Sequence, residues 1–166
     1  MKNYMKAVQP IVLACIMTSA CVSQLQAEST KLEDIGPDAF GAIGEQATGE
    51  VCSSCHGWDV IFGGPRQTPR QWDSTISDML ARGAVASDEQ LDLVGRFLKW
   101  AWGTVWINSA TAQDLVAVLA LPEKDAAAVI AYREEHGSFA DLESLKAVPG
   151  VDPATFDSQA GAIMFN

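Results

Sequence analysis

The chain has 166 residues, of which 48% are hydrophobic and 19% charged, so its length allows one ordinary domain or two small ones. Its 21 acidic side chains outnumber the 11 lysines and arginines, which gives a formal net charge of −10. A chain this acidic repels nucleic acid and anionic membranes and favours basic or neutral protein partners.

The N-terminus has the pattern of a secretory signal peptide. Two lysines are followed by an apolar run over residues 11–22, too short to span a bilayer, and by Ala27 at a plausible cleavage site. A buried helix fits this combination less well. We therefore expect residues 1–27 to be removed on export, which leaves nine basic and 21 acidic side chains. Membrane attachment would require lipidation of Cys21, which lacks the usual aliphatic residue three positions upstream.

Residues 28–43 are expected to form an N-terminal segment, and the cysteine motif GEVCSSCHGW follows at residues 49–58. Two residues separate Cys52 from Cys55, and His56 follows directly. Zinc sites, redox dithiols and haem attachment sites all use cysteine pairs at this spacing.

Haem fits the motif better than the other two chemistries. A structural zinc ion takes four ligands, but the exported chain adds only His136, and the adjacent Cys55 and His56 are poorly arranged around one tetrahedral ion. A thioredoxin-like dithiol lies between a strand and a helix, and no strand pattern flanks this motif. Two thiols at this spacing can add to the two vinyl groups of one haem, and the next residue can place its imidazole at the iron.

The motif CSSCH and its flanks resemble the c-type cytochromes. The resemblance implies that Cys52 and Cys55 hold one haem c through thioether bonds and that His56 is the proximal iron ligand. Export agrees with it, because haem of this type is attached outside the cytoplasm. The expected location is therefore periplasmic.

A methionine downstream is the candidate for the second axial ligand. Apolar residues recur at helical spacing in PRQWDSTISDMLARGA, residues 69–84, so Met79 can be read simply as a core residue. The order CxxCH, Trp, Met, Gly-Ala, helix is similar to that of a family of small bacterial cytochromes. This resemblance implies that Met79 binds the iron, and Met164, His136 or an open site are the alternatives.

Residues 62–66, FGGPR, read as a loop. In cytochromes a loop carbonyl commonly accepts the second ring N–H of the proximal histidine, and Pro65 is the candidate here. Arg66 and Arg70 are candidate partners for haem propionates, although solvated surface arginines are the more common case.

The last helix of the first half is expected to start at Ser87, which forms a capping box with Gln90. Gly95 beside Phe97 allows a close helix crossing. In c-type cytochromes the first and last helices cross in this way near the haem. Residues 44–104 are the expected cytochrome domain.

Residues 107–166 are rich in helix signals, with expected caps at Thr111 and Asp152. The sequence DLVAVLALP at residues 114–122 is echoed by DLESLKAVP at residues 141–149. The echo indicates two related helical units.

This half resembles the helix-hairpin-helix domain of competence proteins of the ComEA type, on the residues IN.A.A..L and A..I.AYRE..G.F..L..L..V.GV. It is also similar to the extrinsic 12 kDa protein of photosystem II, in which such a domain is structural and binds protein. A haem half followed by a hairpin half resembles a type of exported bacterial cytochrome.

Three features of residues 107–166 argue against DNA binding. A DNA-binding hairpin uses glycines to admit a phosphate, but residues 119–125 contain none. In the second hairpin Gly150 is present, but Asp152 stands where another glycine is expected. Three basic and nine acidic side chains give this half a net charge of −6, whereas phosphate contacts need positive charge.

Three tryptophans, Trp100, Trp102 and Trp106, lie within seven residues where the halves join. We interpret them as a packing cluster between the halves, with a partner-docking patch as the alternative.

These patterns predict an all-α protein with a mini cytochrome c fold over residues 44–104 and a helix-hairpin-helix domain over residues 107–166. The expected function is single-electron transfer by one haem c, from a periplasmic dehydrogenase towards a respiratory acceptor, with no enzyme activity of its own and no nucleic acid as partner. The alternative is a binding or scaffold protein whose haem is structural or sensory.

Overall fold

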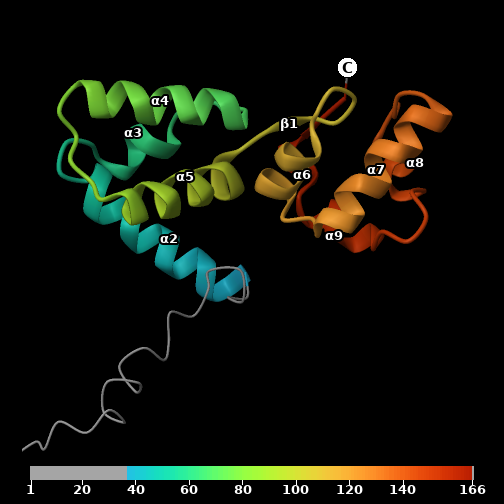
Figure 1. The fold of residues 1–166 in the computed structure, drawn as a ribbon, viewed down its shortest axis with the longest axis horizontal. Helices are drawn as coiled ribbons and strands as arrows, with labels where there is room; N and C mark the ends of the chain where they lie inside the picture. Colours follow the sequence, from blue (N-terminus) through green and yellow to red (C-terminus); the bar gives the residue numbers. More distant parts are fainter. Residues whose placement is uncertain (1–36, 166) are drawn as a thin grey trace, which may run out of the picture. The chain divides into compact units, whose positions relative to one another are not determined.

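The computed structural model describes residues 37–165 (Figure 1). The predicted signal peptide, residues 1–27, and the candidate lipidation site at Cys21 lie outside this range. Helices make up most of the described chain and its strands are a single short pair, which confirms the all-α prediction. No helix within the described range is long and apolar enough to cross a membrane.

The first half of the described chain consists of the helices α2 (Pro37–Cys52), α3 (Trp58–Phe62), α4 (Pro69–Ala81) and α5 (Asp88–Trp102). The helix α2 starts inside the predicted N-terminal segment, so residues 37–43 belong to the first helix of this half. The buried residues at the centre of this half are Ala47, Trp72, Val94, Phe97 and Leu98.

Capping residues determine where α4 and α5 begin. Thr68 and Gln71 form a reciprocal capping box, in which the Thr68 N–H donates to Gln71 Oε1 at 2.8 Å and the Gln71 N–H donates to Thr68 Oγ1 at 3.4 Å. Pro69 occupies the first turn of α4, where its missing N–H costs nothing. Ser87 and Gln90 form the predicted box at the start of α5, with distances of 3.0 and 3.2 Å.

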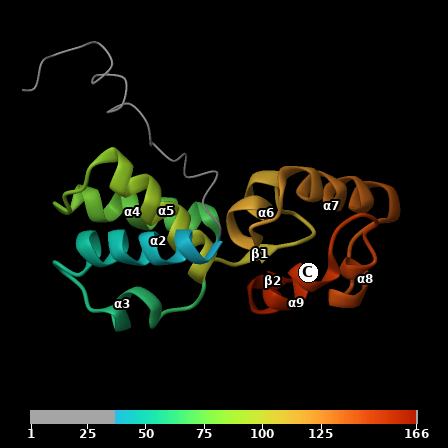
Figure 2. The same cartoon turned by 90° about the horizontal axis from the view of Figure 1, so that it is seen from below.

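The helices α2 and α5 pack together at a glycine (Figures 1 and 2). A Cβ atom added to Gly44 would lie 2.6 Å from Phe97 Cβ, so the backbones approach to a distance that only glycine allows. The close crossing and Phe97 were predicted, but the choice of Gly95 was wrong. Gly95 faces Ile76 of α4, because residues two apart on a helix point in nearly opposite directions.

The second half contains β1 (Val105–Trp106), α6 (Ala112–Leu119), α7 (Glu123–His136), α8 (Leu142–Lys146), α9 (Pro153–Ser158), the short 3-10 helix η2 (Ala160–Ala162) and β2 (Ile163–Met164). The helices α6 and α7 pack together, as do α8 and α9, so the two helical units indicated by the echo are present. The fully buried side chains of this core include Ile107, Leu115, Val118, Leu119, Val129, Leu145 and Phe156.

The turn between α6 and α7 is made without glycine. Ala120 adopts the left-handed conformation, with φ 52° and ψ 29°, and ends α6. A non-glycine residue in this region carries a cost of about 1–2 kcal/mol, which the packing of the surrounding core offsets.

An extended segment, residues 103–107, joins the two halves, and we call it the connector. The Thr104 N–H donates to the carbonyl of Gln67 in the first half at 2.9 Å. In the second half, Val105 pairs in parallel register with Ile163, and the buried Thr104 hydroxyl donates to the carbonyl of Ala162 at 3.0 Å. The connector is therefore bonded to both halves, and the described residues belong to one compact unit.

The three tryptophans near the connector do not form the predicted cluster. Trp100 packs edge-on against Phe40, and Trp102 packs edge-on against Phe62, both within the first half. Trp106, in β1, is 41% exposed. The prediction failed because Trp100 and Trp102 lie in α5 and pack within the first half, whereas Trp106 lies beyond the end of that helix, in β1.

Candidate cofactor site

A cavity of about 430 Å³ is bounded by the C-terminal end of α2 and by α3, α4 and α5. Its volume lies within the range of about 300–1,000 Å³ that is typical of small-molecule and cofactor sites. Cys52, Cys55, His56 and Met79 all line it. The rest of the wall is mainly apolar, with Val51, Val60, Ile61, Trp72, Ile76, Leu80, Ala84, Leu91, Val94 and Leu98.

The cysteine motif makes a tight turn at the end of α2. The N–H groups of Cys55 and His56 both donate to the carbonyl oxygen of Cys52, at 3.1 and 3.0 Å. This turn brings the three side chains of the motif to the same cavity. Cys52 is half-buried and Cys55 is exposed, and both thiols are free.

The environment of the motif disfavours the two other chemistries. Burial raises the pKa of the Cys52 thiol, whereas the attacking cysteine of a redox dithiol has a lowered pKa. His136, the remaining zinc ligand considered, lies at the end of α7, where its ring stacks on Tyr132 with centroids 4.1 Å apart. Within residues 37–165, no three His, Cys, Asp or Glu side chains come together as a metal site.

Met79 reaches the cavity from α4, and the end of that helix fixes its backbone. The Ala84 N–H donates to the carbonyl of Met79 and the Gly83 N–H to the carbonyl of Leu80, both at 3.0 Å. With Gly83 at φ 101°, this is the Schellman arrangement that commonly ends a helix. Met164, the alternative methionine, lies in β2 opposite Trp106 and is 40% exposed.

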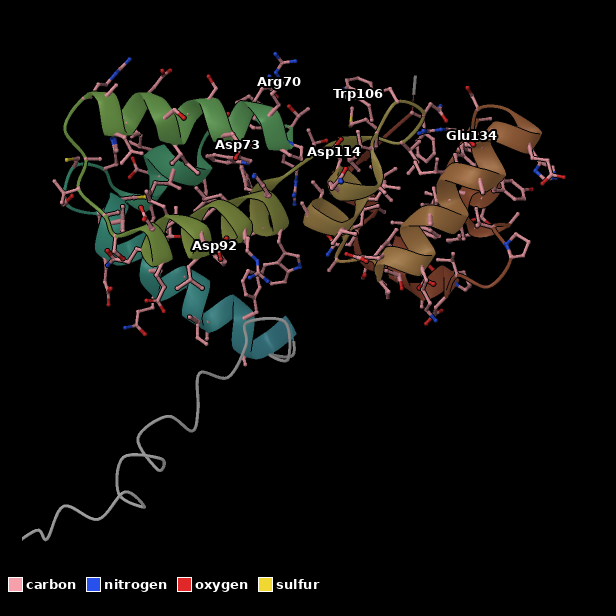
Figure 3. The ribbon with its side chains drawn as sticks, viewed as in Figure 1. Arg70, Asp73, Asp92, Trp106, Asp114 and Glu134 are labelled. Atoms are coloured by element: carbon pink, nitrogen blue, oxygen red, sulfur yellow. The ribbon has the colours of Figure 1, made fainter. Side chains whose placement is uncertain are left out.

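Pro65, Arg66 and Arg70 do not line the cavity. Pro65 is exposed. The Arg66 guanidinium lies over the Trp102 ring, 4.8 Å from its centroid, and donates to the carbonyl of Gly103 at 3.0 Å. Figure 3 shows Arg70 projecting outward from α4. Arg66 thus ties the loop to the end of α5, and the roles predicted for these three residues at a haem have no support in their positions.

Three polar residues of the cavity wall escaped the sequence analysis: Gln67, Thr75 and Arg82. The Thr75 hydroxyl donates to Gln67 Oε1 at 3.0 Å. Arg82 follows the last residue of α4. Its distance of three residues from Met79, nearly one helical turn, was a signal that both side chains could reach the same space.

In the second half, the basic side chains interact with groups of the domain itself. Arg133 donates to the carbonyls of Ile107 and Ala110, at 2.6 and 3.2 Å. Lys146 forms ion pairs with Asp157 and with Glu143, the latter at 3.0 Å.

In the hairpin before α9, the carboxylate of Asp152 caps the start of the helix. The Ala154 N–H donates to Asp152 Oδ1 at 3.0 Å, so this backbone N–H in the first turn of α9 already has a partner within the chain. Together with Ala120 in the first hairpin, this gives both hairpins of the half a local structure that does not depend on a bound anion.

Comparisons with known proteins place a helix-hairpin-helix domain in the second half. Residues 101–164 match the family model of the helix-hairpin-helix motif. A stretch of 51 residues is 41% identical to the Endonuclease/exonuclease/phosphatase family domain-containing protein 1 of Rattus norvegicus, and covers 31% of this chain and 9% of that protein.

A second relative is an uncharacterized protein of Haemophilus influenzae, 38% identical over 60 residues, which are 36% of this chain and 54% of that protein. The chain therefore spans about half of the bacterial protein and a small part of the rat protein. No solved structure matches the chain. The family match begins at residue 101 and so includes the connector, most of which precedes the predicted domain start at residue 107.

Proposed function

We propose that this chain is an electron-transfer protein of the c-type cytochrome class, with one haem c in the cavity between α2, α3, α4 and α5. One observation carries the proposal: the cysteine pair, His56 and Met79 come from separate segments and line the same apolar cavity. A haem c with histidine and methionine ligands needs these groups: two thiols for attachment to the macrocycle, and an imidazole and a thioether for the iron.

Each of these residues has a distinct role in the proposal. Cys52 and Cys55 would hold the macrocycle covalently, and His56 and Met79 would supply the imidazole and the thioether that bind its iron. A haem bound in this way supplies a one-electron couple between ferric and ferrous iron. The apolar wall excludes water, and the methionine ligand favours the reduced state, so both features raise the potential.

The proposed location and partners follow from the type of cofactor. Haem of this type is attached outside the cytoplasm, and the N-terminal sequence has a signal-peptide pattern. We place the protein in the periplasm, where it accepts electrons from a dehydrogenase and passes them towards a respiratory acceptor.

The first experiment asks whether haem is held covalently. The protein is produced in cells that attach haem c and is extracted with acid and acetone. We expect the haem to remain on the wild-type chain and to be lost from a Cys52→Ser, Cys55→Ser variant. Complete release of haem from the wild-type protein would refute the proposal.

The second experiment tests the axial ligand with matched methionine variants. The ferric wild-type protein should show the weak sulfur-to-iron absorption band at the red end of the spectrum, and Met79→Ala should abolish it and lower the midpoint potential. Met164→Ala is the control, because Met164 lies in β2 away from the cavity wall. A band lost in Met164→Ala and kept in Met79→Ala would reverse the assignment.

A second candidate function is favoured by the family match at residues 101–164: a binding or scaffold protein in which the helix-hairpin-helix domain does the work. A reversible redox titration separates the two, because a scaffold with a structural haem need not exchange electrons quickly with a mediator.

We further propose that the hairpin domain contacts protein and not DNA. The bonded N–H of Ala154, the internal contacts of Arg133 and Lys146, and the net charge of −6 over residues 107–166 support this. Duplex DNA is titrated into the whole protein at low salt, where electrostatic affinity is greatest. We expect no binding, and micromolar affinity that salt weakens would restore a DNA role.

A further inference from the structure

We propose that Arg82 is the positioning residue that binds the carboxylate edge of the haem in this cavity. This inference rests on the proposed function, since a haem carries two propionate groups that need cationic or hydrogen-bonding partners. It replaces Arg66 and Arg70, the two arginines that the sequence suggested for the same role.

The charge of the cavity wall points to Arg82. Arg82 is the one lysine or arginine among the residues that line the cavity. Gln67 and Thr75 are polar, but they are hydrogen-bonded to each other at 3.0 Å. A carboxylate brought into this apolar space would therefore find its cationic partner at residue 82.

The backbone around Arg82 is held in place. Its N–H donates to the carbonyls of Asp78 and Met79, both at 3.1 Å, and the left-handed Gly83 follows. The same hydrogen bonds fix the backbone of Met79. The proposed iron ligand Met79 and the cation Arg82 therefore line the cavity from the same end of α4. Arg82 is exposed and also lines the cavity, so this residue borders both the cavity and solvent, as a partner for the polar edge of a haem must.

The two arginines that the sequence suggested, Arg66 and Arg70, are unsuited to the role. Arg66 is committed to the carbonyl of Gly103 and to the Trp102 ring. Arg70 projects away from α4, on a different side from Asp73, which forms an ion pair with Lys99 of α5 at 2.6 Å (Figure 3). A cation at a helix C-terminus also stabilises the helix, so the test must separate that effect from contact with the cofactor.

The test measures the midpoint potential of haem-loaded Arg82→Gln, Arg82→Lys and Arg70→Gln. Without the guanidinium, the propionate charge is uncompensated and stabilises ferric iron. We expect Arg82→Gln to lower the equilibrium constant for reduction about tenfold, which is about 59 mV for a one-electron couple. Arg82→Lys should recover most of the shift because it keeps the charge. Arg70→Gln, which removes the same charge from a site away from the cavity wall, should titrate like the wild type.

The salt dependence of the potential shift distinguishes direct contact between Arg82 and a propionate from an electrostatic effect through solvent. At about 1 M salt the screening length is about 3 Å, so the shift should persist for a contact pair and vanish for a charge that acts through solvent. Helix stabilisation alone would lower the thermal midpoint of Arg82→Gln and leave the potential unchanged. Should that variant accumulate poorly, Arg82→Met, which keeps the apolar part of the side chain, replaces it in the same comparison.

The outcomes also distinguish this inference from the proposed function. Absence of covalent haem in the wild-type protein refutes the function. Covalent haem with equal potentials in Arg82→Gln, Arg70→Gln and wild type refutes the role of Arg82 and leaves the function standing.

Discussion

Alanine in place of Gly44 tests how the α2–α5 crossing supports the wall of the cavity that carries the cysteine motif. The added Cβ would lie 2.6 Å from Phe97 Cβ and 2.8 Å from Phe97 Cγ. Phe97 Cβ is attached to the backbone, so no rotation of the phenylalanine side chain removes the first contact. The helices must move apart, or the structure must accept the strain.

The size of the effect follows from two opposing terms. Alanine has a higher helix propensity than glycine, by about 1 kcal/mol in a helix interior. Overpacking costs about 1–3 kcal/mol, and a clash between backbone-anchored atoms belongs at the upper end. We expect Gly44→Ala to lower the free energy of unfolding by about 2 kcal/mol.

Gly49→Ala is the matched control in the same helix. Its added Cβ would lie 3.4 Å from Trp58 Cζ2, an ordinary contact, so the propensity term dominates and we expect a gain of up to about 1 kcal/mol. Denaturant unfolding of both variants, prepared in the same way and followed by far-UV circular dichroism, measures the difference. The reasoning is refuted if Gly44→Ala is as stable as Gly49→Ala.

Three further predictions concern the second half and the connector. Thr104→Val should lower the free energy of unfolding by about 1–3 kcal/mol, because it leaves the carbonyl of Ala162 without its donor; equal denaturant midpoints would contradict this. The pKa of Asp141 is lowered by the N–H and hydroxyl of Ser144, so its stabilisation is present above the unfolded pKa of about 3.9 and is lost as the pH falls through the folded value. The thermal midpoints of wild type and Asp141→Ala should therefore converge in acid, and a constant gap would argue against it. The pKa of Lys146 is raised by the hydrogen bonds that its ammonium donates to Asp157 and Glu143, so its stabilisation is present below the unfolded pKa of about 10.4 and is lost as the pH rises through the folded value. Lys146→Met should accordingly show less alkaline destabilisation than the wild type in the same thermal assay.

The parts of the fold that depend on neighbouring residues could be predicted from the sequence. The capping boxes at Ser87 and Thr111 each join residues three apart, so their signal is complete within one turn. The position of Met79 on the inner face of α4 followed from helical periodicity. These local patterns do not determine which faces of the helices pack against each other. For that reason Gly44 was missed and Gly95 was chosen.

The outer parts of the candidate site were harder to predict for a physical reason. An arginine has the same local sequence signal whether it faces solvent, a carbonyl or a cavity. The carbonyl of Gly103 that holds Arg66 lies 37 residues further along the chain, and no nearby residue predicts that contact. Arg82 lines the cavity from the C-cap of α4, and the left-handed glycine that follows it is a feature that a Gly-Ala dipeptide indicates only weakly.

The connector determines how the unfolding of the two halves is coupled. Its hydrogen bonds alternate between the halves, since the Thr104 N–H bonds to Gln67 and the Ile107 N–H bonds to the carbonyl of Met164 at 3.0 Å. Unfolding of either half therefore breaks hydrogen bonds of the connector. Native-state hydrogen exchange should therefore find both amides in the slowest class, opening together at the global free energy of unfolding. The family match covers residues 101–164 of the sequence. The part of the chain that we expect to unfold as one unit is larger, because it extends back at least to Gln67.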